Sequence, residues 1–166
     1  MFRHILVPLD GSATAERGLQ QAIRLATAHP SSILLLHVID DFPTMREFAS
    51  YELLAQEQEA RANVPAAMLA AAVQQAAQAG VTAASRVAFA VLDLPDTIVD
   101  IASKEHCELI VLGTHGRRGL ARAVIGSVAE GVARRSPVPV MLVPPAAGTV
   151  AETATAGRPP AHRSIA

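Results

Sequence analysis

The chain has 166 residues and a mass of 17.3 kDa, which suits one domain with a core of its own. Hydrophobic residues make up 51% and charged residues 17%, so intrinsic disorder is excluded for most of the chain. The formal net charge is −1, so no overall positive field would attract nucleic acid or an anionic membrane.

Cysteine usage and hydropathy indicate where the protein resides. Cys107 is the single cysteine, so an internal disulfide is impossible and a reducing compartment fits best. No apolar run approaches the roughly 18 residues that span a bilayer. The first residues lead directly into a strand-like segment and lack the cleavage region of a signal peptide. We therefore expect a cytoplasmic protein with no membrane partner.

The first third of the chain alternates between strand and helix. Residues 5–9 are apolar and predict a buried strand that ends in the turn Asp10-Gly11-Ser12. Apolar residues at helical spacing over 15–26 predict a helix that ends near His29. Residues 33–39 predict a second buried strand.

A long crossover follows the second strand. Residues 45–79 have a strongly helical, alanine-rich composition, and Gly80 is a natural terminator. Pro65 lies inside this stretch, and we expect it to kink or split the helix.

The remaining elements repeat the alternation. Residues 81–90 predict a third strand, and Pro95 suits the first turn of the helix that follows. Residues 109–112 predict the fourth strand, 127–135 a short helix and 138–143 the fifth strand. Such a pattern is typical of an α/β fold, in which a five-stranded parallel sheet carries helices on both faces.

The character of the chain changes after Val143. The last 23 residues are rich in proline, alanine and threonine and contain few large aliphatic side chains. Such a segment cannot bury enough apolar surface to offset the entropy of ordering it. We therefore expect one domain over 1–143 and a disordered tail over 144–166.

The segment after the fourth strand is the strongest candidate for a ligand site. Gly113 and Gly116 are separated by two residues, and Gly116 and Gly126 by nine, with Ser127 next. Glycines let backbone N–H groups approach a ligand, and the start of a helix favours a phosphate. Lys104 is the only lysine, so this is no P-loop. A surface loop whose glycine and serine merely cap a helix remains an alternative on spacing alone.

Other polar residues carry weaker signals. The six histidines show no metal-ligand spacing. His37 lies inside an apolar strand and is expected to be a core histidine with a hydrogen-bond partner. Cys107 precedes a buried strand and is expected to be a packing residue.

These motifs together resemble the universal stress protein family. The glycine pattern over 113–127 is similar to the family's nucleotide loop, residues 4–12 to its opening strand and acidic turn, and residues 137–143 to its closing strand. The resemblance spans about residues 2–143 and implies the family's Rossmann-like sheet, also described as adenine nucleotide alpha hydrolase-like, with strand order 3-2-1-4-5. That order puts the ligand crevice between strands one and four.

The family members that keep the full glycine pattern bind ATP, so the resemblance implies an ATP site here. Asp10 is expected near the ribose, Pro8 and Leu9 along the nucleoside, and Val38 against the adenine. The loop glycines are expected around the phosphates, which would hold most of any Mg²⁺ shell. The implied site residues are Pro8, Leu9, Asp10, Val38, Leu112, Gly113, His115, Gly116, Arg117, Gly126, Ser127 and Val128.

The resemblance also implies a homodimer that pairs through the fifth strand, with Val138, Val140 and Leu142 at its centre. The expected function is a nucleotide-dependent regulatory module of the stress response rather than an enzyme, because residues 113–128 contain no carboxylate to activate water. Two alternatives remain open: a slow ATPase or nucleotidyl-transfer enzyme on the same fold, and a nucleotide-free stress protein that acts through protein contacts.

Overall fold

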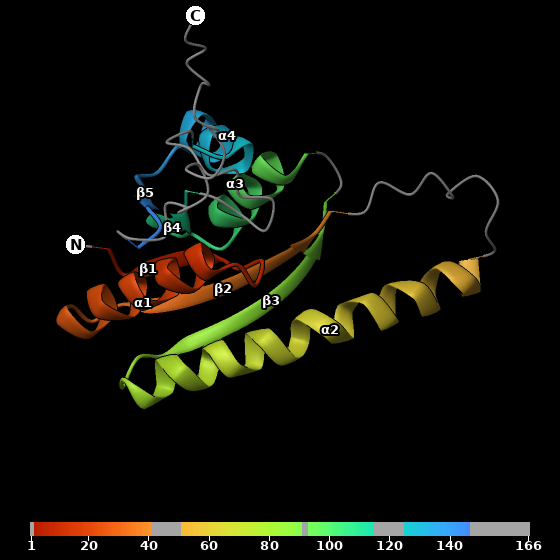
Figure 1. The fold of residues 1–166 in the computed structure, drawn as a ribbon, viewed down its shortest axis with the longest axis horizontal. Coiled ribbons are helices and arrows are strands. Elements are labelled where there is room, and N and C mark those ends of the chain that lie inside the picture. The colour runs from red at the N-terminus through yellow and green to blue at the C-terminus, as the bar shows by residue number, and fades with distance from the viewer. Residues whose placement is uncertain (1, 41–50, 91–92, 115–124, 147–166) are drawn as a thin grey trace, which may run out of the picture.

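A computed structural model describes residues 2–40, 51–90, 93–114 and 125–146. Five strands form one sheet in the order β3-β2-β1-β4-β5, and each neighbouring pair is parallel. The strands are β1 (His4–Pro8), β2 (Ser32–Ile39), β3 (Ala83–Phe89), β4 (Leu109–Gly113) and β5 (Val140–Val143). Both the α/β class and the strand order expected from the sequence are confirmed (Figure 1).

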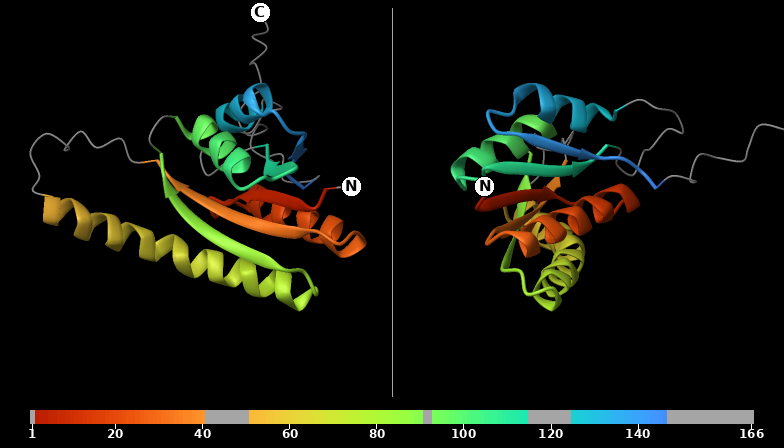
Figure 2. Two further views of the ribbon diagram at one scale, coloured as in Figure 1. Left: turned by 180° about the vertical axis from the view of Figure 1, so that it is seen from behind. Right: turned by 90° about the vertical axis from the view of Figure 1, so that its left-hand side faces the viewer.

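The described helices cover both faces of the sheet (Figure 2). They are α1 (Ala13–Ala28), α2 (Tyr51–Gln78), α3 (Leu94–Lys104) and α4 (Ser127–Arg135). One core cluster joins α1 and α2 to odd-numbered strand residues such as Val7 and Leu35. The other joins α3 and α4 to even-numbered residues such as Leu6 and Leu36. Because side chains alternate along a strand, each strand supplies both cores.

Helix α2 corrects one prediction from the sequence. The sequence predicted a kink or a split at Pro65, but α2 runs as one helix from Tyr51 to Gln78 with Pro65 inside it, so the split is wrong (Figure 1). Proline removes one backbone hydrogen bond, but the alanines after it favour the helix. Leu69, Ala72 and Ala76 then bury the C-terminal half against the sheet, and this packing outweighs the lost bond.

Helices α3 and α4 are joined by a polar contact and a close packing contact. Asp93 caps α3 by accepting the Asp96 N–H at 2.8 Å, and Arg135 of α4 reaches both carboxylates, at 2.6 and 3.0 Å. The Asp96 N–H and the Arg135 guanidinium together hold the pKa of Asp93 below its usual range. Nearby, a Cβ on Gly131 would lie 2.6 Å from the ring of Pro95, so only glycine fits this crossing.

The α1 helix lies unusually close to the end of β4. A Cβ built on Gly113 would lie 2.7 Å from the backbone carbonyl carbon of Thr14 and 2.8 Å from its oxygen. These are backbone atoms, which cannot swing aside as a flexible side chain would. Gly113 therefore has a packing role that is independent of any ligand, because it sets how near the start of α1 comes to the sheet.

Strand β5 ends at Val143, and the Arg17 side chain donates from Nε to the Pro144 carbonyl at 3.0 Å. Residues 147–166, the bulk of the predicted disordered tail, lie outside the described residues. The boundary at 143 remains a prediction.

The close approach at Gly113 predicts a difference between two neighbouring glycines. Gly113→Ala should lower the free energy of unfolding by about 1–3 kcal/mol, as overpacking does elsewhere. Gly18→Ala is the matched control, because its Cβ would lie 3.5 Å from Gly113 N, an ordinary contact, and alanine favours a helix. Urea denaturation should find Gly18→Ala at least as stable as the unaltered protein. Equal stability of the two variants would contradict the packing role of Gly113.

Candidate functional site at the carboxyl ends of β1 and β4

Strands β1 and β4 part before they end. Their pairing runs through Ile5↔Leu109 and Leu6↔Ile110, whereas β1 stays paired with β2 as far as Pro8↔Leu36. Along β1 the even-numbered residues direct their backbone polar groups at β4, since the Glu108 N–H donates to the His4 carbonyl at 2.8 Å. Pro8 is the next even residue after Leu6, and it has no N–H to donate.

The missing donor at Pro8 gives a local reason for the parting of the strands. β4 itself continues to Gly113, paired on its other side with β5 up to Gly113↔Val143. The crevice expected from the strand order therefore falls between β1 and β4, where the pairing stops and the order reverses. In open parallel sheets this position is the usual place for a ligand.

A tight turn leads from β1 into α1 at this opening. Gly11 adopts φ of 79°, a left-handed conformation that favours glycine. The Asp10 carboxylate accepts the Ser12 N–H at 2.9 Å, and the Ser12 hydroxyl accepts the Ala15 N–H at 3.1 Å, which caps α1. The turn thus holds Asp10, half-buried, at the mouth of the crevice between the two strands.

The other residues that were predicted to contact the nucleoside differ in how deeply their side chains are buried. Val38 is partly buried and packs with the core under α3 and α4. Leu9 and Leu112 are 5% and 4% exposed, in the cores on opposite faces of the sheet. Their side chains belong to the cores, so these two residues would meet a ligand mainly through backbone.

The N-terminus of α4 differs from those of α1 and α3. Gly126 is its N-cap and supplies no side-chain hydrogen bond, whereas Ser12 caps α1 and Asp93 caps α3. Ser127 is exposed and Val128 is partly buried in the first turn. The positive end of the α4 dipole is therefore not covered by a cap of its own, an arrangement that suits an anion.

A hydrogen bond links the two ends of the glycine-rich loop. The Gly126 N–H donates to the Thr114 carbonyl at 2.7 Å, and the Thr114 N–H donates to the Val143 carbonyl at 3.0 Å. The start of α4 is thereby fixed beside the end of β4, so the structure brings Gly113 and Gly126 together. His115, Gly116 and Arg117, also predicted for this site, lie outside the described residues.

Neither of two grooves on the described surface coincides with the start of α4. One, of about 590 Å³, lies between the start of α1 and the middle of α2, and its charged lining residue is Glu16. The other, of about 310 Å³, lies between β3 and α3, and its charged lining residues are two carboxylates, Asp96 and Asp100, and two cations, Arg86 and Lys104. The carboxylate of the first groove repels a polyphosphate, and the cations of the second are already paired, Arg86 with Glu105 and Lys104 with Asp100. The N-terminus of α4 therefore suits phosphate better than either groove does.

Other chemistry is weakly supported in the described part of the chain. Cys107 is buried, as expected, and burial raises the pKa of its thiol to about 11, which keeps it protonated and a poor nucleophile. Within residues 2–40, 51–90, 93–114 and 125–146, no three His, Cys, Asp or Glu side chains gather to hold a metal ion. None of the described helices is long and apolar enough to cross a membrane.

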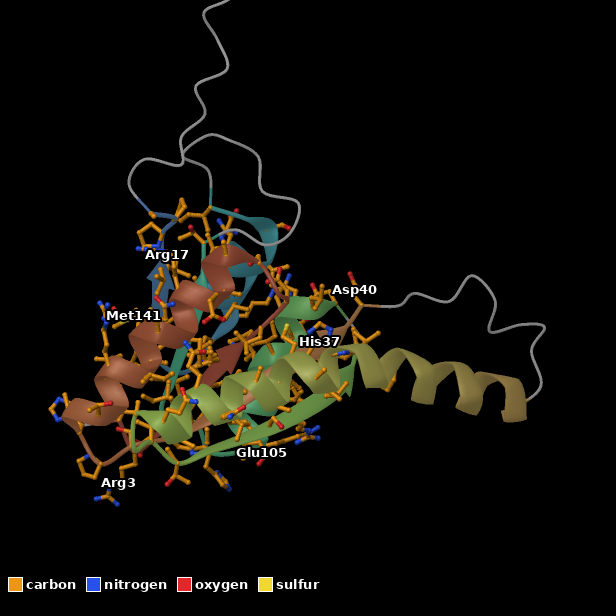
Figure 3. All side chains as sticks on the ribbon, turned by 60° about the horizontal axis from the view of Figure 1, so that its bottom comes forward. Arg3, Arg17, His37, Asp40, Glu105 and Met141 are labelled. Atoms are coloured by element: carbon orange, nitrogen blue, oxygen red, sulfur yellow. The ribbon has the colours of Figure 1, made fainter. Side chains whose placement is uncertain are left out.

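His37 has a partner that the sequence did not identify. Its Nδ1 lies 2.7 Å from the Leu9 carbonyl oxygen, so the expectation of a hydrogen-bonded histidine is confirmed. Figure 3 labels His37 and Asp40 near the carboxyl end of β2. The Asp93–Arg135 contact was also missed, although the order Asp93, Pro95, Asp96 is a recognisable helix start.

Comparison with known proteins points to one family. The sequence model described as the universal stress protein family matches residues 1–144. The chain is 30% identical over 146 residues to the putative universal stress protein SH1215 of Staphylococcus haemolyticus, with 86% of this chain and 84% of the relative aligned. The solved structure of MJ0577 matches with a TM-score of 0.75 at 29% identity, over 89% of this chain and 99% of that chain.

Two further solved structures share the fold at 24% identity. One is a universal stress protein in complex with cAMP, with a TM-score of 0.62 over 86% of this chain and 96% of that chain. The other is the universal stress protein from Archaeoglobus fulgidus in complex with dAMP, with a TM-score of 0.59 over 85% and 97%. The family match covers the parted strands, the Asp10 turn and the start of α4 alike, and the chain belongs to the universal stress protein family.

Proposed function

We propose that this universal stress protein binds ATP and acts as a nucleotide-dependent regulatory module. The observation that carries the proposal is the start of α4, which lacks a side-chain cap and is fixed by Thr114 and Gly126 beside the crevice between β1 and β4. Helix N-termini with free N–H groups bind phosphate, and the reversal of strand order provides room for the rest of a nucleotide.

The proposed ligand crosses the carboxyl edge of the sheet. Its phosphates lie beside Gly126, where the N–H groups of Ser127 and Val128 and the Ser127 hydroxyl donate to them, while the Gly126 N–H stays bonded to the Thr114 carbonyl. Its ribose lies near Asp10, whose turn is held by the Ser12 N–H. Its adenine lies toward Val38 on β2. A bound Mg²⁺ would be held mainly by the phosphates and water, since Mg²⁺ commonly keeps several waters beside substrate phosphates.

The solved relatives support an adenine nucleotide as the ligand class. Two members of this fold were determined with cAMP and dAMP, so the fold accommodates an adenine nucleoside with a phosphate. A triphosphate adds negative charge at the end where the glycine-rich loop meets α4, which favours ATP over a monophosphate at this chain's loop.

A regulatory role fits the site better than efficient hydrolysis does. Hydrolysis of ATP needs a group that orients or deprotonates the attacking water. Residues 113–128 contain no carboxylate, and the Asp10 carboxylate is engaged with the Ser12 N–H at the ribose end. We therefore propose that the protein retains ATP and presents the bound state to a protein partner.

The proposed assembly is a homodimer that pairs β5 with β5. β5 is an edge strand of the sheet, and its odd-numbered residues bond to β4, since the Ile110 N–H donates to the Pro139 carbonyl and the Thr114 N–H to the Val143 carbonyl. The backbone groups of Val140 and Leu142 consequently face the open edge, which is a template for another strand.

Substitution of the α4 N-cap tests the phosphate position. Gly126 has φ of −63°, which any residue adopts, so Gly126→Asp should fold normally and cap α4 with its own carboxylate. That carboxylate would occupy the N–H groups and repel phosphate, so calorimetry should show ATP affinity lowered at least tenfold, about 1.4 kcal/mol. Gly126→Asn, of the same shape and uncharged, should lose less. An unchanged affinity in Gly126→Asp would place the phosphates elsewhere.

A phosphate-release assay distinguishes the regulatory module from an enzyme. Typical enzymes turn over at about 1–1,000 per second. With ATP and Mg²⁺ we expect release on a timescale of minutes or slower, because no carboxylate in 113–128 activates water. Turnover near one per second would instead favour the ATPase alternative.

Removing one outward-facing N–H tests the dimer. Val140→Pro deletes a donor at the open edge and leaves the bonds to β4 in place, a position where strands tolerate proline. Light scattering should find the unaltered chain at twice 17.3 kDa and the variant at 17.3 kDa, with unchanged circular dichroism. Val140→Thr keeps the N–H and should remain dimeric. A monomeric unaltered protein at micromolar concentration would contradict the proposed dimer.

A further inference from the structure

His37 makes a hydrogen bond that joins two segments 28 positions apart. Its Nδ1 lies 2.7 Å from the carbonyl oxygen of Leu9 in a partly buried setting. A carbonyl oxygen only accepts, so Nδ1 carries the hydrogen and donates it. This bond fixes which ring nitrogen is protonated in the neutral side chain and ties the residue after β1 to β2.

The backbone of Leu9 is held on both of its polar groups. Its N–H donates to the Leu36 carbonyl at 2.7 Å, and its carbonyl accepts from His37. β1 has ended one residue earlier, at Pro8. The His37 side chain therefore supplies a hydrogen bond in place of the backbone ladder, at the point where the chain leaves the sheet and turns toward Asp10.

The orientation of the Leu9 carbonyl also decides the direction of the next amide. The Leu9 C=O and the Asp10 N–H belong to one planar peptide unit, and the described chain contains no cis peptide, so the two groups point in opposite directions. The carbonyl is directed at β2. The Asp10 N–H is consequently directed away from the His37 ring and from β2.

His37 supports this peptide from the face away from the proposed nucleotide. Ile33 and Leu35 of β2 lie in the core under α1 and α2, and alternation puts His37 on that same face. Val38, the proposed adenine contact, packs with the core under α3 and α4. His37 thus acts through the Leu9–Asp10 peptide rather than by touching the ligand.

We infer that His37 is a positioning residue of the nucleotide site, which sets the Leu9–Asp10 peptide so that Asp10 faces the crevice between β1 and β4. The inference rests on the proposed function. It adds to that function a residue from outside the predicted ligand contacts. It also explains why a polar ring stands within the apolar stretch from Ile33 to Ile39.

Two variants with side chains of similar shape, one with a hydrogen-bond donor and one without, test whether the bond from His37 to the Leu9 carbonyl is needed. In His37→Asn the amide nitrogen stands as many bonds from Cα as Nδ1 does, so it can donate to Leu9, whereas His37→Leu has the same branching and no donor. Calorimetry should show the ATP affinity of His37→Leu lowered roughly five- to tenfold, as for one lost hydrogen bond, and that of His37→Asn within about twofold of the unaltered protein.

A second readout needs no nucleotide. In amide NMR spectra of the ligand-free protein, both variants lose the ring current of the imidazole, and the Asp10 resonance should move further from its original position in His37→Leu than in His37→Asn. Should His37→Leu fail to fold, His37→Gln replaces it, because its amide lies one methylene too far for the same bond and it should lose affinity in the same way.

The outcomes distinguish the positioning role of His37 from the proposed binding of ATP. ATP binding that is unchanged in a folded His37→Leu, or lost equally in His37→Asn and His37→Leu, would overturn the positioning role and leave the proposed function standing. Failure of the unaltered protein to bind ATP would overturn both.

Discussion

The site depends on one absent hydrogen-bond donor. Pro8 stands where β1 would next donate to β4, and the pairing of these strands stops after Leu6↔Ile110. The two central strands therefore separate at their carboxyl ends while each remains paired with its outer neighbour, β2 or β5. The expected crevice lies at this reversal of strand order, beside strands that stay regularly paired on their outer sides.

Close backbone contacts then bring two helix starts to that crevice. Gly113 lets the first turn of α1 approach β4 within a distance that no Cβ would allow, and the Thr114–Gly126 hydrogen bond fixes the start of α4 beside the same strand end. The α1 start is capped by Ser12, whereas the α4 start has no side-chain cap. In the proposed complex, this difference in capping favours the anionic end of the ligand at α4 and its sugar at the Asp10 turn.

Much of this could be read from the sequence, and the exceptions have physical causes. The alternation of apolar runs with amphipathic stretches predicted the parallel sheet with two covered faces, and the family resemblance supplied the strand order. The split expected at Pro65 was wrong because packing of α2 on the sheet outweighs one lost bond. The partner of His37 depends on the register of β1 against β2, which a sequence does not state. Gly113 was interpreted through a ligand, but its contact with Thr14 is visible only once α1 is in place.

The most direct test of the account is to map ATP onto the protein by amide NMR. Titration with ATP and Mg²⁺ should move the resonances of Asp10, Val38, Gly113 and Ser127 most, because these residues surround the crevice and the start of α4 from four separate segments of the chain. The groove between β3 and α3, lined by Arg86 and Thr97 among others, should remain unaffected. The largest shifts in that groove, with none at Ser127, would contradict a nucleotide site between β1 and β4.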